Sequence, residues 1–194
     1  IFEGTNEINR LVVVNTLLRR ATKGKIPLME VAQRVMGEAK DPSKIKAPSK
    51  EGPLGWEVRT TEFAKHALLY AANAAIGKYM TTLQEEQEII EILAEMIIEA
   101  FAMDSTVTRT LQIVQARGEN KAVVPVAITS VIVQEGYDTI MGLATKLLGS
   151  IFEGEEALKH LKALESFKIT ERIKLIEKKR QIAAYTVEKD GYLI

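Results

Sequence analysis

The sequence is marked first by the residue types it lacks. Its 194 residues contain no cysteine and only two histidines. The absence of cysteine excludes disulfide bonds and thiol catalysis within these residues. The histidines, His66 and His160, are far apart along the chain. We therefore expect each of them to pack against neighbours or to lie at the surface, and we expect no metal site.

An excess of charge of either sign and a long apolar run are missing too. Lys and Arg together number 26, as do Asp and Glu. Nucleic-acid binding calls for a basic excess or a basic face, so we expect no nucleic-acid partner. The longest apolar run, residues 122–133, is interrupted by Pro125 and is shorter than the ~20 residues that cross a bilayer. The sequence shows no signal peptide and no initiator methionine, so we expect it to be part of a longer protein.

The residues that are present favour helices. Aromatic residues make up 6% of the chain, while Ala, Leu, Ile, Glu and Lys dominate. Apolar residues recur at steps of three and four, most clearly over residues 82–116, where the pattern lasts about seven turns. We predict an all-α bundle of six or seven helices, with the long ones mostly antiparallel. The expected helices cover about residues 5–23, 27–39, 56–79, 82–116, 125–148, 155–165 and 171–188.

Two features of the long helices concern their packing. Gly136 and Gly142 lower helix stability, so we expect them to mark close approach between helices. A stripe of glutamates lies along the fourth helix, and solvation is its simplest interpretation. The alternative is that the stripe meets basic residues near the end of the chain. The stripe consists of Glu88, Glu91, Glu95 and Glu99, and the basic candidates are Lys168, Arg172, Lys174, Lys178, Lys179 and Arg180.

One linker is evident, over residues 40–55. It contains Pro42, Pro48 and Pro53, which together exclude a regular helix. The segment is mildly basic. We interpret it as a solvated loop, with contact to an anionic membrane surface as the weaker alternative.

The first ten residues, IFEGTNEINR, differ from this helical scaffold. Gly4 permits backbone conformations that other residues avoid and lets another group approach the main chain. Thr5 or Asn6 is a good N-cap, and Glu7 then lies in the first helical turn, where the helix dipole favours negative charge. A loop that leads into a helix N-terminus offers free N–H groups to an anionic or polar ligand. Glu3 precedes this turn, and a carboxylate beside apolar surface can act as a general base. Judged on spacing alone, a glutamate at such a position is more commonly a solvated residue that aids the helix cap.

The run IFEGTNEINRL resembles the C-terminal signature of the FAD-dependent acyl-CoA dehydrogenases. That pattern is an aromatic residue, Glu-Gly-Thr, a polar residue, an acidic residue or amide, an apolar residue, and Arg two positions on. The matching positions are Phe2, Glu3, Gly4, Thr5, Asn6, Glu7, Ile8 and Arg10. A match of this length is far more specific than a single glycine pattern.

The resemblance implies a role for each matched residue. Glu3 corresponds to the catalytic base that removes the α-proton of an acyl-CoA thioester while a hydride leaves the β-carbon for the flavin. Phe2 and Gly4 correspond to positions beside the substrate. Thr5, Asn6 and Glu7 correspond to positions that contact FAD. The stretch 151–154 repeats the letters IFEG, but the residues after it do not match the flavin-contacting positions, so we interpret it as coincidence.

The resemblance also implies a domain organisation. Residues 1–24 would end the catalytic domain, residues 25–55 would form a short helix and linker, and residues 56–194 would form a helical extension. This extension resembles the extra C-terminal domain of the very-long-chain type of acyl-CoA dehydrogenase and its bacterial relatives. Because the other domains of such enzymes are not in this sequence, we do not expect the chain alone to bind FAD tightly or to oxidise acyl-CoA.

Partners and location follow from the same resemblance. The intact enzyme would use acyl-CoA as substrate, pass electrons to an electron-transfer acceptor in fatty-acid β-oxidation, and form a homo-oligomer. A bacterial cytoplasm is the expected location, with the mitochondrion as the alternative. A different class of function is a helical assembly module that contacts subunits, a partner or a membrane surface. An exposed apolar face would favour this second function.

Overall fold

The computed structural model describes residues 4–189 and is all-α in this part, without a strand. Seven α-helices are present there, together with four short 3-10 helices, which confirms the predicted class and number. Their bounds are α1 Asn6–Thr22, α2 Leu28–Lys40, α3 Gly55–Tyr79, α4 Gln87–Arg117, α5 Val123–Ile151, α6 Gly154–Leu164 and α7 Leu175–Lys189, with η1 Pro42–Lys44, η2 Met80–Glu85, η3 Glu119–Lys121 and η4 Glu165–Phe167.

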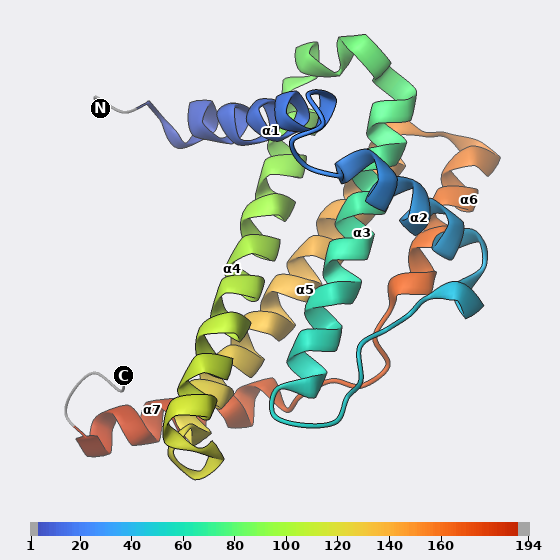
Figure 1. Cartoon of the computed structure of the whole chain (residues 1–194). Coiled ribbons are helices and arrows are strands. Elements are labelled where there is room, and N and C mark those ends of the chain that lie inside the picture. Colours follow the sequence, from blue (N-terminus) through green and yellow to red (C-terminus); the bar gives the residue numbers. More distant parts are fainter. Residues whose placement is uncertain (1–3, 190–194) are drawn as a thin grey trace.

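Three long helices form the body of the molecule (Figure 1). α4 runs antiparallel to both α3 and α5, so that α3 and α5 point the same way. α4 ends at Arg117, and the capping residue Gly118, which has a φ of +81°, redirects the chain towards α5. Pro125 falls in the first turn of α5, where the missing N–H of proline removes no helical hydrogen bond. α1 crosses one end of this body, and α7 crosses the other end (Figure 1).

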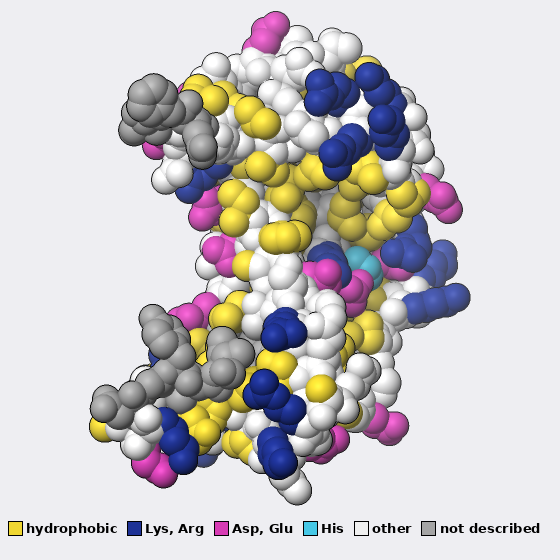
Figure 2. Space-filling view, turned by 60° about the vertical axis from the view of Figure 1, so that its left-hand side comes forward, with side chains coloured by type: hydrophobic (Ala, Val, Ile, Leu, Met, Phe, Trp, Pro, Cys, Tyr) yellow, Lys and Arg dark blue, Asp and Glu magenta, His cyan; other side chains and the backbone are white. Residues whose placement is uncertain are grey.

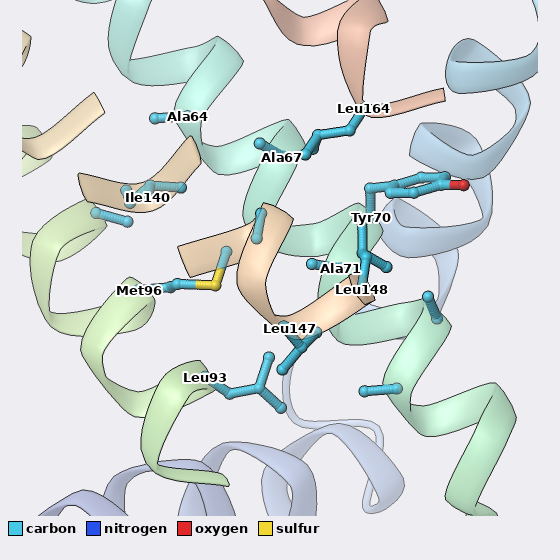
Figure 3. Packing of buried hydrophobic residues seen from close by; sticks show 14 of the residues in the cluster. Ala64, Ala67, Tyr70, Ala71, Leu93, Met96, Ile140, Leu147, Leu148 and Leu164 are labelled. Atoms are coloured by element: carbon cyan, nitrogen blue, oxygen red, sulfur yellow. The ribbon is translucent and has the colours of Figure 1, made fainter. Parts of the chain in front are cut away.

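The core between these helices is built from alanines and larger apolar side chains (Figure 3). α3 contributes a row of alanines, and α4 and α5 contribute larger residues that pack onto it. Alanine keeps the helix backbones close, because it adds only a methyl group to the helix surface. The buried members labelled in the close view are Ala64, Ala67, Tyr70, Ala71, Leu93, Met96, Ile140, Leu147, Leu148 and Leu164.

Gly136 lies where α5 packs tightly against α4. A Cβ atom at this position would lie 2.8 Å from Met103 Cγ and 2.9 Å from its Sδ. Met103 is fully buried, so its side chain has little room to move aside. The prediction for Gly142 was wrong, because a Cβ there would meet nothing within 4 Å. Gly142 points away from the neighbouring helices, and its position in the sequence could not reveal this.

The acidic stripe does not meet the basic residues near the end of the chain. α7 and the segment before it pack on α5 instead, where Arg172 binds Asp138 at 2.7 Å and Lys179 binds Glu135. α7 crosses one end of the bundle, whereas the stripe occupies the N-terminal half of α4, near α1 (Figure 1). The stripe residue Glu95 pairs with Arg10 of α1.

None of the helices described over residues 4–189 combines the length and apolar character needed to cross a membrane.

We predict opposite effects of alanine at the two glycines of α5. Gly136→Ala should lower the free energy of unfolding by about 1–3 kcal/mol, because its methyl group would overlap buried Met103. Gly142→Ala is the matched control and should raise it by about 0.5–1 kcal/mol, since alanine favours the helix and meets no neighbour. Urea unfolding followed by circular dichroism measures both. Equal effects of the two substitutions would contradict the assigned helix contact.

Candidate functional site

The signature residues that the structure describes, from Gly4 to Arg10, lie at the N-terminal end of α1. Gly4 has a φ of +85°, a conformation that glycine adopts easily, as expected for the turn that precedes the helix. Thr5 is the N-cap, and its hydroxyl accepts a hydrogen bond from the Ile8 N–H at 3.4 Å. The structure therefore selects Thr5 over Asn6 as the cap. Phe2 and Glu3, the predicted pocket aromatic and catalytic base, lie outside the described residues.

The first turn of α1 is exposed and carries the positive end of the helix dipole. Gly4, Thr5, Asn6 and Glu7 are all exposed. The pKa of the Glu7 carboxyl is lowered, first by the backbone N–H of Glu7 itself and then by the Thr5 hydroxyl. Backbone N–H groups in a first helical turn have no partner within the helix, so this end can receive an anionic or polar group. No residue from 8 to 189 covers it enough to bury it.

Arg10 joins this helix to α4 by a charged pair, in addition to the apolar contacts of Val14. Its Nε and Nη2 donate to Glu95 Oε2 of α4 at 3.0 and 2.8 Å. The pKa of the Arg10 guanidinium is raised by this hydrogen bond and by the charge of Glu95. Sequence comparison with the signature had singled out Arg10 but not its partner. The acidic stripe was the only sequence signal for Glu95, because the two residues are 85 positions apart.

Beside α1 lies an apolar groove of about 250 Å³. Its walls come from α1, α3 and α4, with smaller contributions from Leu28 and Leu83. Phe101 lies in the groove wall and is 73% exposed, and the Lys65–Asp104 ion pair stands at its edge. Figure 2 shows apolar side chains gathered across this side of the molecule, below the part that carries α1. Ile8 and Val12 of α1 are also more than half exposed.

The two histidines occupy separate sites. His66 is buried on α3, where its Nδ1 lies 3.6 Å from Glu38 Oε2 of α2. His160 of α6 is hydrogen-bonded through Nδ1 to Tyr70 Oη at 2.8 Å and stacks on Phe152. Burial lowers the pKa of both imidazoles, and Glu38 only partly offsets this for His66. Among residues 4–189, no three acidic or histidine side chains are arranged to hold a metal ion.

Comparison with known proteins places the chain in a family. Residues 63–166 match the family model described as "Acyl-CoA dehydrogenase, C-terminal domain". A "Probable acyl-CoA dehydrogenase" of Bacillus subtilis (strain 168) is 36% identical over 196 residues. A crystal structure of an acyl-CoA dehydrogenase from Bacillus anthracis, solved in complex with FAD, is similar with a TM-score of 0.91 and 34% identity.

The chain therefore belongs to the acyl-CoA dehydrogenase family, as the first residues indicated. Both comparisons cover 100% of this chain but only 32% of the relative. The chain thus spans about a third of the length of these proteins and matches their C-terminal part.

The lowered histidine pKa values predict a loss of stability in mild acid. An unfolded histidine takes up its proton near pH 6.5, whereas His66 and His160 in the folded chain do so only at lower pH. The unfolded state therefore binds more protons as the pH falls below about 6.5, and the free energy of unfolding decreases. Above that range, the histidines should leave it unchanged.

Urea unfolding measured between pH 7.5 and pH 5.5 tests this sign. The doubly substituted chain with His66→Gln and His160→Gln is the control, because it lacks both imidazoles and keeps every other titratable group. Its pH profile should be flatter than that of the unchanged chain. A chain that becomes more stable on acidification through pH 6.5, by an amount the double substitution removes, would contradict the lowered pKa values.

Proposed function

We propose that this chain is the C-terminal part of an FAD-dependent acyl-CoA dehydrogenase. The intact enzyme would oxidise the α,β-bond of fatty acyl-CoA thioesters in fatty-acid β-oxidation. The observation that carries this proposal is a full-length match of the chain to acyl-CoA dehydrogenases, with the signature residues at an exposed helix start. The proposed boundaries are residues 1–24 for the end of the catalytic domain, 25–55 for the short helix and linker, and 56–194 for the extension.

Glu3 is the proposed base. Its carboxylate would take the α-proton of the thioester. The α-proton is only weakly acidic, so the base must be shielded from water and the developing negative charge must meet fixed donors. Phe2 and Gly4 would lie beside the substrate, and the positive φ of Gly4 suits a turn where a ligand approaches the main chain.

The residues at the start of α1 suit a flavin nucleotide. Thr5, Asn6 and Glu7 are exposed, and the first turn presents free backbone N–H groups at the positive end of the helix. A pyrophosphate or another polar group of FAD fits such donors. When bound, FAD supplies the acceptor for the hydride that leaves the β-carbon. The relative from Bacillus anthracis was solved in complex with FAD, which supports this assignment.

The rest of the enzyme would complete the site and cover the exposed end of α1. We propose acyl-CoA and an electron-transfer acceptor as partners of the intact protein, and a cytoplasmic location, which the two Bacillus relatives support. Membrane contact through residues 40–55 has less support. Parts of this segment pack back onto the protein, since Pro48 accepts a hydrogen bond from Arg59 and Lys50 binds Glu171.

We predict that Glu3→Gln in the intact enzyme lowers kcat by about 10²–10⁴-fold. The amide keeps the size of the side chain but cannot accept the α-proton. Reduction of the flavin by an acyl-CoA substrate, followed by its absorbance, measures the rate. Glu153→Gln is the matched control, because Glu153 follows the same Ile-Phe pair and is exposed at the start of α6. A Glu3→Gln enzyme that retains the normal rate, with Glu153→Gln equally active, would rule out the assigned base.

The apolar groove favours a second, compatible function, which is assembly. Phe101 is 73% exposed in a groove wall that is apolar apart from Lys65 and Asp104, and large exposed apolar surfaces commonly mark interfaces. The partner surface would come from another subunit or from the rest of the same enzyme. Homo-oligomer formation is therefore part of the proposal.

We predict that the 194-residue chain self-associates at micromolar concentration through this groove. Phe101→Glu should shift it towards the monomer, because a carboxylate on the groove wall opposes burial. Ile176→Glu is the control, since Ile176 is similarly exposed but lies on α7, at the other end of the bundle. Sedimentation velocity measures the three species. A wholly monomeric unchanged chain would remove the support for assembly through the groove.

A further inference from the structure

The apolar groove beside α1 has walls that residues 4–189 cover only in part. Phe101 is 73% exposed there. The groove measures about 250 Å³, which is less than the ~300–1,000 Å³ of a typical small-molecule pocket. It therefore suits side chains from another protein surface better than a free ligand. Four more of its lining side chains are partly exposed, namely Leu17, Leu18, Leu68 and Ile97.

The polar edge of the groove is already paired within the bundle. Lys65 Nζ lies 2.8 Å from Glu62 Oε1 and 2.5 Å from Asp104 Oδ1. Apart from Lys65 and Asp104, the lining side chains are apolar. A polar group buried against them would lose its hydration without gaining a hydrogen bond, which is unfavourable. The surface that fills the groove is therefore expected to be apolar as well.

α1 connects the groove to the signature residues. Val14, Leu17 and Leu18 of α1 line the groove. The helix begins at Asn6, so Val14 lies about 12 Å from its start at a rise of 1.5 Å per residue. Ile8 of α1 is also more than half exposed. Any part of the protein that covers the start of α1 therefore comes close to the groove.

The proposed function places the rest of the enzyme at this end of the bundle. The chain covers 32% of each Bacillus relative and matches a C-terminal domain, so the greater part of such an enzyme would precede residue 1. That upstream part would cover the start of α1 to complete the site. A surface tethered so close has an effective concentration of about millimolar, which a second copy at micromolar concentration does not reach.

We propose that the upstream part of the same polypeptide fills the groove with an apolar surface. α1 would then be packed between this part and the bundle, which would brace the helix that carries the signature residues from both sides. The inference rests on the proposed function, because that function supplies the upstream part. The 194-residue chain alone leaves the groove open and so is expected to self-associate, whereas the intact enzyme would close the groove within one subunit.

Site-specific photocrosslinking in the intact enzyme tests this contact. Phe101→p-benzoylphenylalanine exchanges one aromatic side chain for another at an exposed position of the groove. Irradiation should link position 101 to a peptide that precedes residue 1. The product should keep the mass of a single subunit in a denaturing gel, because both linked peptides belong to one polypeptide.

Ile176→p-benzoylphenylalanine is the matched control. Ile176 is 67% exposed, but it lies on α7 at the other end of the bundle (Figure 1). It should therefore give no link to the upstream part. Equal links from positions 101 and 176 would show that the reaction does not report the groove, and would overturn the proposal.

Two other results would also overturn it. A linked product with the mass of two subunits would place a second copy in the groove. A position 101 that gives no link to the upstream part would leave the groove without the proposed occupant.

The cross-link and the enzymatic activity fail separately. Flavin reduction by an acyl-CoA reports the proposed function, whereas the cross-link reports only which surface lies against Phe101. A protein without this activity that still gives the single-subunit product would reject the proposed function and support the groove contact. An active enzyme without that product would support the function and overturn the contact.

Discussion

The close packing of α3, α4 and α5 is the constraint on which the other features depend. The alanine row of α3 and the single glycine contact at Gly136 let three long helices approach with little space between their backbones. Met96 and Met103 fill the remaining irregular gaps, a role that suits the flexible thioether side chain. Fully burying a side chain of this size contributes about 1.5–3 kcal/mol. The rigid three-helix body then provides fixed surfaces for α1 at one end and for α7 at the other.

The signature residues are connected to that body by a charged pair, in addition to the apolar contacts of Val14 further along α1. α1 is mostly solvent-exposed at its start, so its own packing would leave the first turn weakly positioned. Arg10 donates two hydrogen bonds to Glu95 of α4. This contact lies one helical turn after Glu7 and connects α1 to the three-helix body. Charged hydrogen bonds of this kind are stronger than neutral ones and define an orientation. The exposed start of α1 is therefore held in a fixed orientation. A binding site that other parts of the intact enzyme complete needs such a fixed orientation.

The Glu38–His66 pair shows a different use of buried polarity. Elsewhere in the core, some polar side chains satisfy one another, as Ser130 does with Glu57 and Thr110 with Thr129, while Thr61 Oγ1 and Gln134 Oε1 have no partner within residues 4–189. Glu38 and His66 are buried to a similar degree but leave two atoms without a partner beside a cavity. Their nearest polar neighbours are each other, because Glu38 Oε2 and His66 Nδ1 face one another at 3.6 Å.

Local sequence patterns were sufficient to predict the all-α class, the helices and the N-cap region, because these depend on residues a few positions apart. The family signature was readable for the same reason, since its eight matched positions fall within ten residues. Only the tertiary structure decided which side chains meet. Arg10 meets Glu95 across 85 positions, and the C-terminal arginine and lysine bind α5, not the acidic stripe. Gly136 and Gly142 look alike in the sequence, but helix rotation directs only Gly136 at a neighbour. Such pairings follow from the crossing and rotation of helices, which the periodicity of a single helix does not specify.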